Sequence, residues 1–379
     1  MSAMDHLLSD AEIAFRDALV ATLLRCVPEE LRARNAADRE LSRADFVLAQ
    51  KALHAEGLAV PHWPVEWGGR DWTATERFLW MHSLQTCAVP PPLPFNADMI
   101  GPVLARYGTE AQKARFLPPT AALDIWWCQG FSEPDAGSDL AALSTRAVRD
   151  GDSYVVSGQK TWTSYAQHAD WMFLLVRTDP GAAKKQLGIS FLLLDMASAG
   201  VTVRPIRTMD GRHEVNEVFL DAVRVPVENL VGEKDRGWDV AKFLLGNERH
   251  AIAGVGLSRL RLERARALMA GGAADPGLAQ RADDIEADLL ALETLQLLAL
   301  KRVPAGAFGV ADHAASVLKI RGSEVQQATT ELLLDAAQGL DLELAEDCWR
   351  AFCSMRKVSI YGGSNEVQRE ILARQALGI

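Results

Sequence analysis

Hydrophobic residues in the first third of the chain recur at helical spacing. Residues 11–19 and 44–53 place apolar side chains three and four positions apart, which predicts amphipathic helices. Segments rich in proline or glycine at 61–69 and 90–94 interrupt this pattern, and we expect loops there. The pattern therefore predicts an N-terminal helical domain over residues 1–123.

The spacing of apolar residues changes in the middle of the chain. Short runs of β-branched and aromatic residues are separated by turn residues, which favours strands over helices. Helical spacing returns at about Gly237 and continues to the end. We therefore expect a mainly α protein with a central β domain, a small barrel or sandwich over residues 124–236, and a C-terminal helical bundle over residues 237–379. The expected strands cover residues 153–158, 171–176, 189–194, 201–204 and 217–220.

The composition narrows the class of protein. The chain has 379 residues, of which 49% are hydrophobic and 24% charged, as in ordinary globular proteins. Its formal net charge of −10 argues against nucleic-acid binding, because a polyphosphate partner needs a basic face. The N-terminus lacks the apolar core of a signal peptide, and no apolar run reaches membrane-spanning length. We expect neither nucleic acid nor membrane among the partners.

The cysteines indicate a reducing compartment. Their number is odd and none forms a Cys-x-x-Cys pair, so we expect neither a disulfide framework nor a metal site. This usage is typical of a cytoplasmic protein. The five residues are Cys26, Cys87, Cys128, Cys348 and Cys353.

Two polar segments near the middle of the chain carry the candidate chemistry. Residues 131–139 read FSEPDAGSD, and residues 157–164 read SGQKTWTS. The first combines a proline, a glycine and several oxygen-bearing side chains, which predicts a sharp turn that offers hydroxyl and backbone donors. We expect the second to be a polar hairpin turn that ends in Trp162, whose flat face suits an aromatic ring system. Taken singly, the first could be a plain loop and Trp162 a core aromatic residue.

Together with the features below, these segments resemble the acyl-CoA dehydrogenase family, and the resemblance runs over nearly the whole chain. It implies an N-terminal helical domain, a small β-barrel and a C-terminal four-helix bundle, with FAD as cofactor and an acyl-CoA as substrate. Ser164 stands where the family usually has a threonine, and it retains the hydroxyl. The cofactor contacts that the resemblance implies are Phe131, Ser132, Trp162, Ser164 and Ser364.

The resemblance also implies two contacts to the substrate. Ser138 falls where the family contacts the pantetheine or phosphate portion of CoA. Arg249 matches another CoA contact, although a surface salt bridge would equally explain an arginine there.

The expected catalytic base is a glutamate, for which the family uses two positions. Many members carry it in a Tyr-Glu-Gly segment near the C-terminus, but this chain has Gly362 there, and a glycine cannot accept a proton. The other arrangement places the glutamate on the first helix of the C-terminal domain, where Glu248 matches. The resemblance thus implies Glu248 as the base, and Gly362 as a donor to the thioester oxygen through its backbone N–H.

Periodicity favours Glu248 independently of the resemblance. It lies within an apolar stripe, and burial of a carboxylate raises its pKa and makes it a better base. The alternative is a core glutamate that pairs with an arginine. The stripe consists of Ala241, Leu244, Leu245, Ala251, Ile252 and Val255.

Two segments that reach a neighbouring subunit's FAD in homotetrameric members are missing. They are Arg-x-x-Phe-Gly and Gln-x-x-Gly-Gly-x-Gly, and the corresponding residues 273–281 and 335–341 contain neither. The chain therefore resembles large subunits of heteromeric dehydrogenases of the steroid side-chain or pimeloyl-CoA type, which implies an α2β2 assembly with a homologous unlike chain. Otherwise another cation, such as Arg281 or Arg321, would have to reach the pyrophosphate.

The function implied is FAD-dependent α,β-dehydrogenation of an acyl-CoA thioester to the trans-2-enoyl-CoA. The resemblance implies an electron-transfer flavoprotein as electron acceptor, and nothing in the sequence fixes the acyl group. Two alternatives share the fold: a flavin-dependent monooxygenase or oxidase, and a non-catalytic partner subunit.

Overall fold

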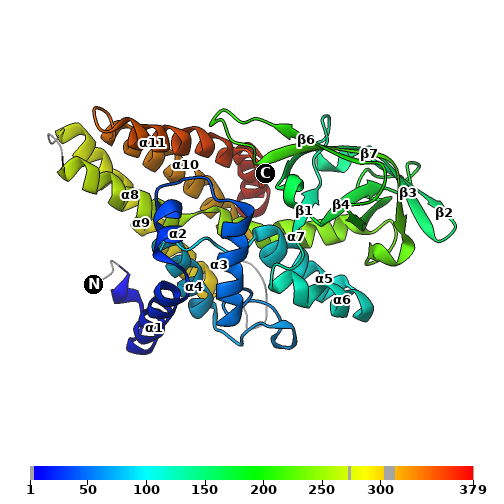
Figure 1. Cartoon of the computed structure of the whole chain (residues 1–379), viewed down its shortest axis with the longest axis horizontal. Coiled ribbons are helices and arrows are strands. Elements are labelled where there is room, and N and C mark those ends of the chain that lie inside the picture. The colour runs from blue at the N-terminus through cyan, green and yellow to red at the C-terminus, as the bar shows by residue number, and fades with distance from the viewer. Residues whose placement is uncertain (1–3, 272–274, 303–311, 379) are drawn as a thin grey trace. The chain divides into compact units, whose positions relative to one another are not determined.

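The computed structural model describes residues 4–271, 275–302 and 312–378, with the side chains at 247–252, 312 and 377 left undescribed. The chain divides into two compact units, which Figure 1 colours by position in the sequence. A helical unit contains Met1–His62, Asp71–Pro91 and Gly246–Ile379, and a β unit contains Trp63–Arg70 and Pro92–Leu245. The predicted order of helices, β domain and helices is confirmed, while the domain boundaries at 123 and 236 stay predictions.

The N-terminal helices begin at well-defined caps. Ser9, Ser42 and Thr73 each accept a hydrogen bond from the third residue of the following helix, whose side chain bonds back to the cap. The helices predicted over 11–19 and 44–53 are confirmed within α1 and α3. The helices are α1 (Asp10–Cys26), α2 (Glu29–Ala36), α3 (Arg43–Ala55) and α4 (Ala74–Thr86).

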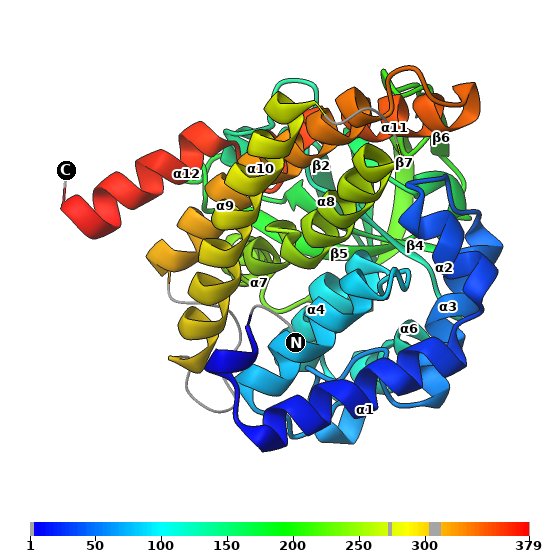
Figure 2. The same cartoon turned by 90° about the vertical axis from the view of Figure 1, so that its left-hand side faces the viewer.

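The C-terminal helices of the same unit lie side by side, as the two views in Figures 1 and 2 agree. Their shared core is aliphatic, with Leu262, Leu289, Leu318 and Leu332 fully buried. The helices are α8 (Val255–Ala270), α9 (Pro276–Lys301), α10 (Asp312–Ala336), α11 (Leu342–Met355) and α12 (Asn365–Leu372).

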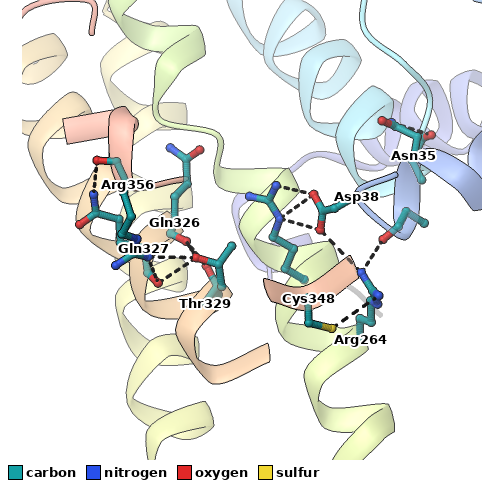
Figure 3. Close-up of polar contacts among 12 residues, drawn as sticks. Asn35, Asp38, Arg264, Gln326, Gln327, Thr329, Cys348 and Arg356 are labelled. Atoms are coloured by element: carbon teal, nitrogen blue, oxygen red, sulfur yellow. Dashed lines mark hydrogen bonds and ion pairs between the residues drawn. The ribbon is translucent and has the colours of Figure 1, made fainter. Parts of the chain in front are cut away.

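A buried charge cluster connects the N-terminal helices to this bundle. The guanidinium of Arg261 donates to Asp38 at 2.5 Å, and Arg264 lies 3.6 Å from the same carboxylate. Figure 3 shows Asp38 beside Arg264, which also contacts the sulfur of Cys348 at 3.7 Å. Residues more than 200 positions apart in sequence are thereby joined within one unit.

The β unit contains one eight-stranded sheet, with β1 paired to β4 off the path β6-β7-β3-β2-β4-β5-β8. Its inner face is packed with Val156, Leu174, Leu192 and Val218, all fully buried. The five predicted strands are confirmed. The strands are β1 (Trp127–Gly130), β2 (Arg146–Asp150), β3 (Ser153–Ser164), β4 (Trp171–Arg177), β5 (Ile189–Asp195), β6 (Val201–Ile206), β7 (Val215–Pro226) and β8 (Leu230–Val231).

Helices of the β unit are fixed to the sheet by buried polar contacts. Asn96 accepts from the backbone N–H of Trp127 at 3.0 Å and donates to the carbonyl of Ile125 at 2.7 Å. Gly237 begins α7 against β5, where a Cβ would lie 2.5 Å from the carbonyl carbon of Ser190. These helices are the π-helix η3 (Phe95–Ile100), α5 (Gly101–Tyr107), α6 (Glu110–Ala121) and the first part of α7 (Gly237–Ile252).

Two predictions about local structure are wrong. Residues 157–164 do not form a hairpin turn, because they continue β3 and pair with β7 through Ser164. The apolar stripe assigned to one helix is divided, since α7 ends at Ile252 and Val255 begins α8. Gly254, which has a left-handed φ of +57°, separates the two helices. Among the described residues, no helix is both long and apolar enough to cross a membrane.

Candidate functional site

Trp162 lies on a bulge in β3. Lys160 pairs with Val218 and Thr163 with Asn216, so two residues of β3 oppose the single residue Glu217 of β7. Trp162 has a left-handed φ of +58°, and 61% of its surface is exposed. A bulky residue in this conformation costs about 1 kcal/mol or more and persists only where its surroundings enforce it. The bulge thus leaves most of the indole exposed, an arrangement suited to an aromatic ligand.

The segment 131–139 forms the sharp turn that its sequence predicts. The backbone N–H of Glu133 donates to the carbonyl of Ala136 at 3.0 Å, and the reverse bond measures 3.1 Å. The carbonyl of Ser132 accepts from the N–H of Thr161 at 2.9 Å. Ser132 is half-buried and Ser138 exposed. Both predicted segments therefore meet directly, with Ser132 beside the bulge that carries Trp162.

A buried ion pair holds the two segments together. The ammonium of Lys160 donates to Glu133 at 2.8 Å, and to the carbonyls of Phe131 and Leu175 at 3.2 and 2.8 Å. The carboxylate of Glu133 also accepts from the backbone N–H groups of Ser144 and Thr145, at 2.6 and 2.9 Å. Lys160 is fully buried and Glu133 is 5% exposed.

The pKa values of Glu133 and Lys160 both reflect this burial and the opposite charge beside each group. Burial alone would raise the pKa of Glu133, but the Lys160 charge and the hydrogen bonds outweigh it and hold that pKa at about 2. Burial lowers the pKa of Lys160 to about 8, against the opposing effect of Glu133. At neutral pH both groups are charged, and the pair stays intact.

Phe131 and Ser164 flank the bulge at different depths. The ring of Phe131 is buried and makes edge contacts with Phe173 and Phe191, at centroid distances of 6.0 and 6.2 Å. Its ring belongs to the core, so any contact to a cofactor would come from its backbone. Ser164 is half-buried at the end of β3 and precedes Tyr165, which has a left-handed φ of +55°.

In the helical unit, Gly362 and Gly363 form a left-handed turn, with φ of +63° and +87°. Ser364 follows as the N-cap of α12 and accepts from the N–H of Val367 at 3.3 Å. A Cβ at Gly363 would lie 2.6 Å from the side-chain nitrogen of Gln368. Glycine suits both turn positions because it adopts positive φ without steric cost.

The predicted residues Glu248 and Arg249 fall on α7, but their side chains lie outside the described residues. Of their stripe, Ala241 and Leu244 are fully buried. The structure therefore brings together Phe131, Ser132, Trp162 and Ser164 in the β unit, and Gly362 and Ser364 in the helical unit.

Sequence reasoning missed three charged residues of this region. Glu133 and Lys160 stand inside the two quoted segments, and the available signal was that Lys160 falls an even number of residues after Tyr154 and Val156, which are buried on the same strand. The third is Asp98 on the π-helix η3, where burial raises the pKa of the carboxyl to about 7.

The three parts of the acyl-CoA dehydrogenase family match the chain in order: the N-terminal domain over residues 9–124, the middle domain over 128–223 and the C-terminal domain over 235–377. The acyl-CoA dehydrogenase IpdE1 of Mycolicibacterium smegmatis (strain ATCC 700084 / mc(2)155) is 35% identical over 348 residues, covering 86% of each chain. The chain therefore belongs to the acyl-CoA dehydrogenase family and is an oxidoreductase that acts on acyl-CoA, as the sequence predicted.

Solved structures agree with this assignment. The Tcur3481-Tcur3483 steroid ACAD has a TM-score of 0.87 at 29% identity, covering 98% of both chains. The ChsE4-ChsE5 complex from Mycobacterium tuberculosis has a TM-score of 0.83 at 29% identity, also covering 98% of both chains. The FAD complex of PigA, with a TM-score of 0.82 over 98% of both chains, is 20% identical and shows the fold alone.

The ion pair makes a testable contribution to stability. Lys160→Met removes the cation and leaves the Glu133 carboxylate buried, so urea denaturation should show a loss of about 3–5 kcal/mol in the free energy of unfolding. Lys185→Met removes a matched but exposed pair, that of Lys185 with Asp139 at 3.0 Å, and should cost about 1 kcal/mol or less. Equal losses in both variants would contradict a special role for the buried pair.

The same pair predicts a pH dependence. The pKa of Glu133 is about 2 in the folded chain, below its ordinary value of 4.5, so its stabilising contribution is complete above about pH 4.5. It is lost progressively as pH falls from there toward 2. Urea denaturation between pH 6 and about pH 3 should therefore show a shallower acid loss in Glu133→Gln than in the wild type. Parallel pH dependences would show that other carboxylates dominate acid unfolding.

Proposed function

We propose that this chain is the catalytic subunit of a heteromeric, FAD-dependent acyl-CoA dehydrogenase that forms a trans-2-enoyl-CoA. The observation that carries the proposal is Trp162, an exposed indole on strained backbone beside the Ser132 turn, in a chain of this family. Strain and exposure of a large aromatic residue have no benefit for folding, but they are expected where a flat ligand binds.

The residues of the bulge fit a flavin ring. Trp162 would offer its indole face, while Ser132 and Ser164 would offer hydroxyl donors and acceptors at the ring edge. The side-chain oxygen of Thr163, which is buried and has no hydrogen-bond partner among the described residues, lies on the same bulge. Ser364 and the backbone of Phe131 complete the proposed cofactor contacts. FAD, when bound, supplies a hydride acceptor for the β carbon of the substrate.

Glu248 and Gly362 share the remaining chemistry. The α-proton of a thioester is weakly acidic, so a carboxylate must accept it while a donor stabilises the negative oxygen that develops. Glu248 is the proposed acceptor. Gly362 has no side chain for that task, and its N–H is the proposed donor to the thioester oxygen.

Ser138 and Arg249 are the proposed contacts to CoA. The exposed hydroxyl of Ser138 can hydrogen-bond a pantetheine amide or a phosphate, and Arg249 adds a positive charge for the phosphates. Because a steroid ACAD is among the solved structures that resemble the chain, we favour a bulky acyl group of the steroid side-chain or dicarboxylic type. An electron-transfer flavoprotein is the proposed electron acceptor, and the cytoplasm the proposed location.

The heteromeric assembly is supported by the state of the two arginines that could have replaced the missing segments, because both are already paired. Arg281 pairs with Asp335 at 2.7 Å, and Arg321 pairs with Asp288 and Glu324 at 2.9 and 2.6 Å. Both arginines are therefore engaged by carboxylates. The segment around 335–347 is also rich in acidic residues, which would repel a pyrophosphate. An unlike chain is thus the proposed source of the missing arginine and glutamine.

The first prediction of the proposal concerns the base. Glu248→Gln should keep the flavin spectrum and acyl-CoA binding but lower kcat by about 10²-fold or more, because the proton acceptor is lost. Asp98→Asn is the matched control, since burial raises the pKa of this other carboxyl to about 7. If Asp98→Asn removed turnover while Glu248→Gln left it within a few-fold, the base would be Asp98.

The second prediction concerns the flavin contact. Trp162→Ala removes an exposed side chain, so thermal stability should change little, while FAD affinity should fall by about 3- to 10-fold with a shifted absorption spectrum. Trp162→Phe keeps a ring and should restore most of the affinity. Unchanged flavin content and spectrum in Trp162→Ala would show that Trp162 does not contact the flavin.

The third prediction concerns assembly. Expressed alone, the chain should be largely free of FAD and inactive, and co-expression with the homologous unlike chain should restore both, because a ligand that binds only the assembled form stabilises that form. Arg281→Gln should leave the FAD content of the heteromer unchanged. A homo-oligomer isolated with full FAD and dehydrogenase activity would refute the heteromer, and loss of FAD from it in Arg281→Gln would identify the substitute cation.

A further inference from the structure

One face of α10 carries a stripe of buried polar residues. Lys319, Gly322, Ser323 and Gln326 follow one another at the spacing of a single helix face, and all four are buried. Lys319 and Ser323 have no exposed surface, and Gln326 is 4% exposed. A buried lysine is unusual, because hydrophobic residues would pack such a face without the cost of burying a charge.

Two residues of this stripe, Gly322 and Gln326, contact the residue that follows the end of α7. The side-chain amide of Gln326 donates to the carbonyl of Ala253 at 3.1 Å. Gly322 allows the close approach, since a Cβ there would lie 2.6 Å from the Cα of Ala253. Ala253 follows Ile252, the last residue of α7, and Glu248 lies one helical turn earlier on the same helix.

The other two residues of the stripe, Lys319 and Ser323, hold the start of α12. The ammonium of Lys319 donates to the side-chain oxygen of Asn365 at 2.9 Å, and the hydroxyl of Ser323 donates to the same atom at 3.1 Å. Asn365 directly follows the turn of Gly362, Gly363 and Ser364.

The neighbouring residue Gln327 supports the approach to this turn. Its amide donates to the carbonyl of Arg356 at 3.3 Å and to the hydroxyl of Ser359 at 3.2 Å. Figure 3 shows Gln327 and Arg356 close together, with Gln326 and Thr329 on the same helix. The chain segment before Gly362 and the segment after it are therefore both bonded to α10.

We propose that the stripe of Lys319, Gly322, Ser323 and Gln326 sets the backbone that carries Glu248 relative to the backbone N–H of Gly362. This inference rests on the proposed function, in which these two groups act on one thioester. Gln326 and Lys319 are positioning residues. Each bonds to a segment that bears a reacting group, but the reacting groups themselves belong to Glu248 and Gly362. Directional hydrogen bonds from one rigid helix fix two segments more closely than apolar contacts would.

The test uses two near-isosteric variants in the assembled holoenzyme. Gln326→Met and Lys319→Met keep the length of the side chain and remove its donors. Each should lower kcat by about 10- to 100-fold while KM and FAD content stay close to wild type, because misplacement of a reacting group by about 1 Å has that effect. Gly322→Ala acts by a different route, pushing Ala253 away, and should lower kcat in the same way.

Thr329→Val is the matched control. Thr329 is fully buried on α10, and its hydroxyl donates within the helix to the backbone carbonyls of Val325 and Gln326, at 2.5 and 3.2 Å. The change therefore removes buried hydrogen bonds to backbone carbonyls of α10 itself and leaves the side chains that contact Ala253 and Asn365 in place, so kcat should not change.

Hydrogen–deuterium exchange supplies a readout that does not depend on activity. Gln326→Met should speed exchange in peptides that cover the end of α7, and Lys319→Met in peptides that cover residues 359–368, with neither change in Thr329→Val. If Gln326→Met, Lys319→Met and Gly322→Ala all match Thr329→Val in kcat and exchange, the positioning role is overturned. Full activity of Glu248→Gln would instead overturn the proposed function.

Discussion

The buried ion pair between Lys160 and Glu133 is the contact on which the arrangement of Ser132 and Trp162 in the β unit depends. Burying an ammonium and a carboxylate costs several kcal/mol for each ion, and their attraction offsets this only when further hydrogen bonds satisfy both groups. Here the carbonyls of Phe131 and Leu175 satisfy the ammonium, and two backbone N–H groups satisfy the carboxylate. A fully satisfied pair of this kind is rigid. It explains how a bulge can keep Trp162 exposed on left-handed backbone, since relaxing that strain would require moving Lys160, two residues away.

The sequence patterns predicted the elements well where local spacing determines them. The helical spacing gave α1 and α3, and the short runs of β-branched and aromatic residues between turns gave five of the strands that form the sheet. Residues 157–164 were misread because Ser157, Gly158 and Gln159 have the composition of a turn. Their pairing with β7, across more than 50 residues of sequence, decides their conformation instead. The end of α7 was readable, because Gly254 is a common helix stop, but the apolar spacing continues through it into α8.

The residues of the candidate site and their contacts could not be predicted from local sequence patterns. Ser132, Trp162 and Ser164 came from resemblance to a family, and only the structure shows that the backbone of Ser132 is bonded to the bulge. Lys160 and Glu133 stood in the same two segments and were passed over, because charged residues are exposed in most proteins and nothing local indicates that these two pair. The two partners are 27 residues apart, so their pairing depends on the tertiary structure. The same holds for Lys319, whose partner Asn365 lies 46 residues away.

Because position 362 is a glycine, the carboxylate that accepts the proton has to come from another segment of the chain. A glutamate at a left-handed position would carry a steric cost that glycine avoids, so the conformation of this turn and the absence of a side chain there agree with each other. The proton acceptor must then come from elsewhere, and a helix is a more rigid support than a loop. That arrangement divides the proposed reacting groups between two segments separated by more than 100 residues, Glu248 before the end of α7 and Gly362 before the start of α12. Such a division needs a third element that contacts both, and α10 is the helix whose buried polar residues bond to each of them. Under the proposed mechanism, the polar residues in that core serve to position two reacting groups, a requirement that packing alone does not impose.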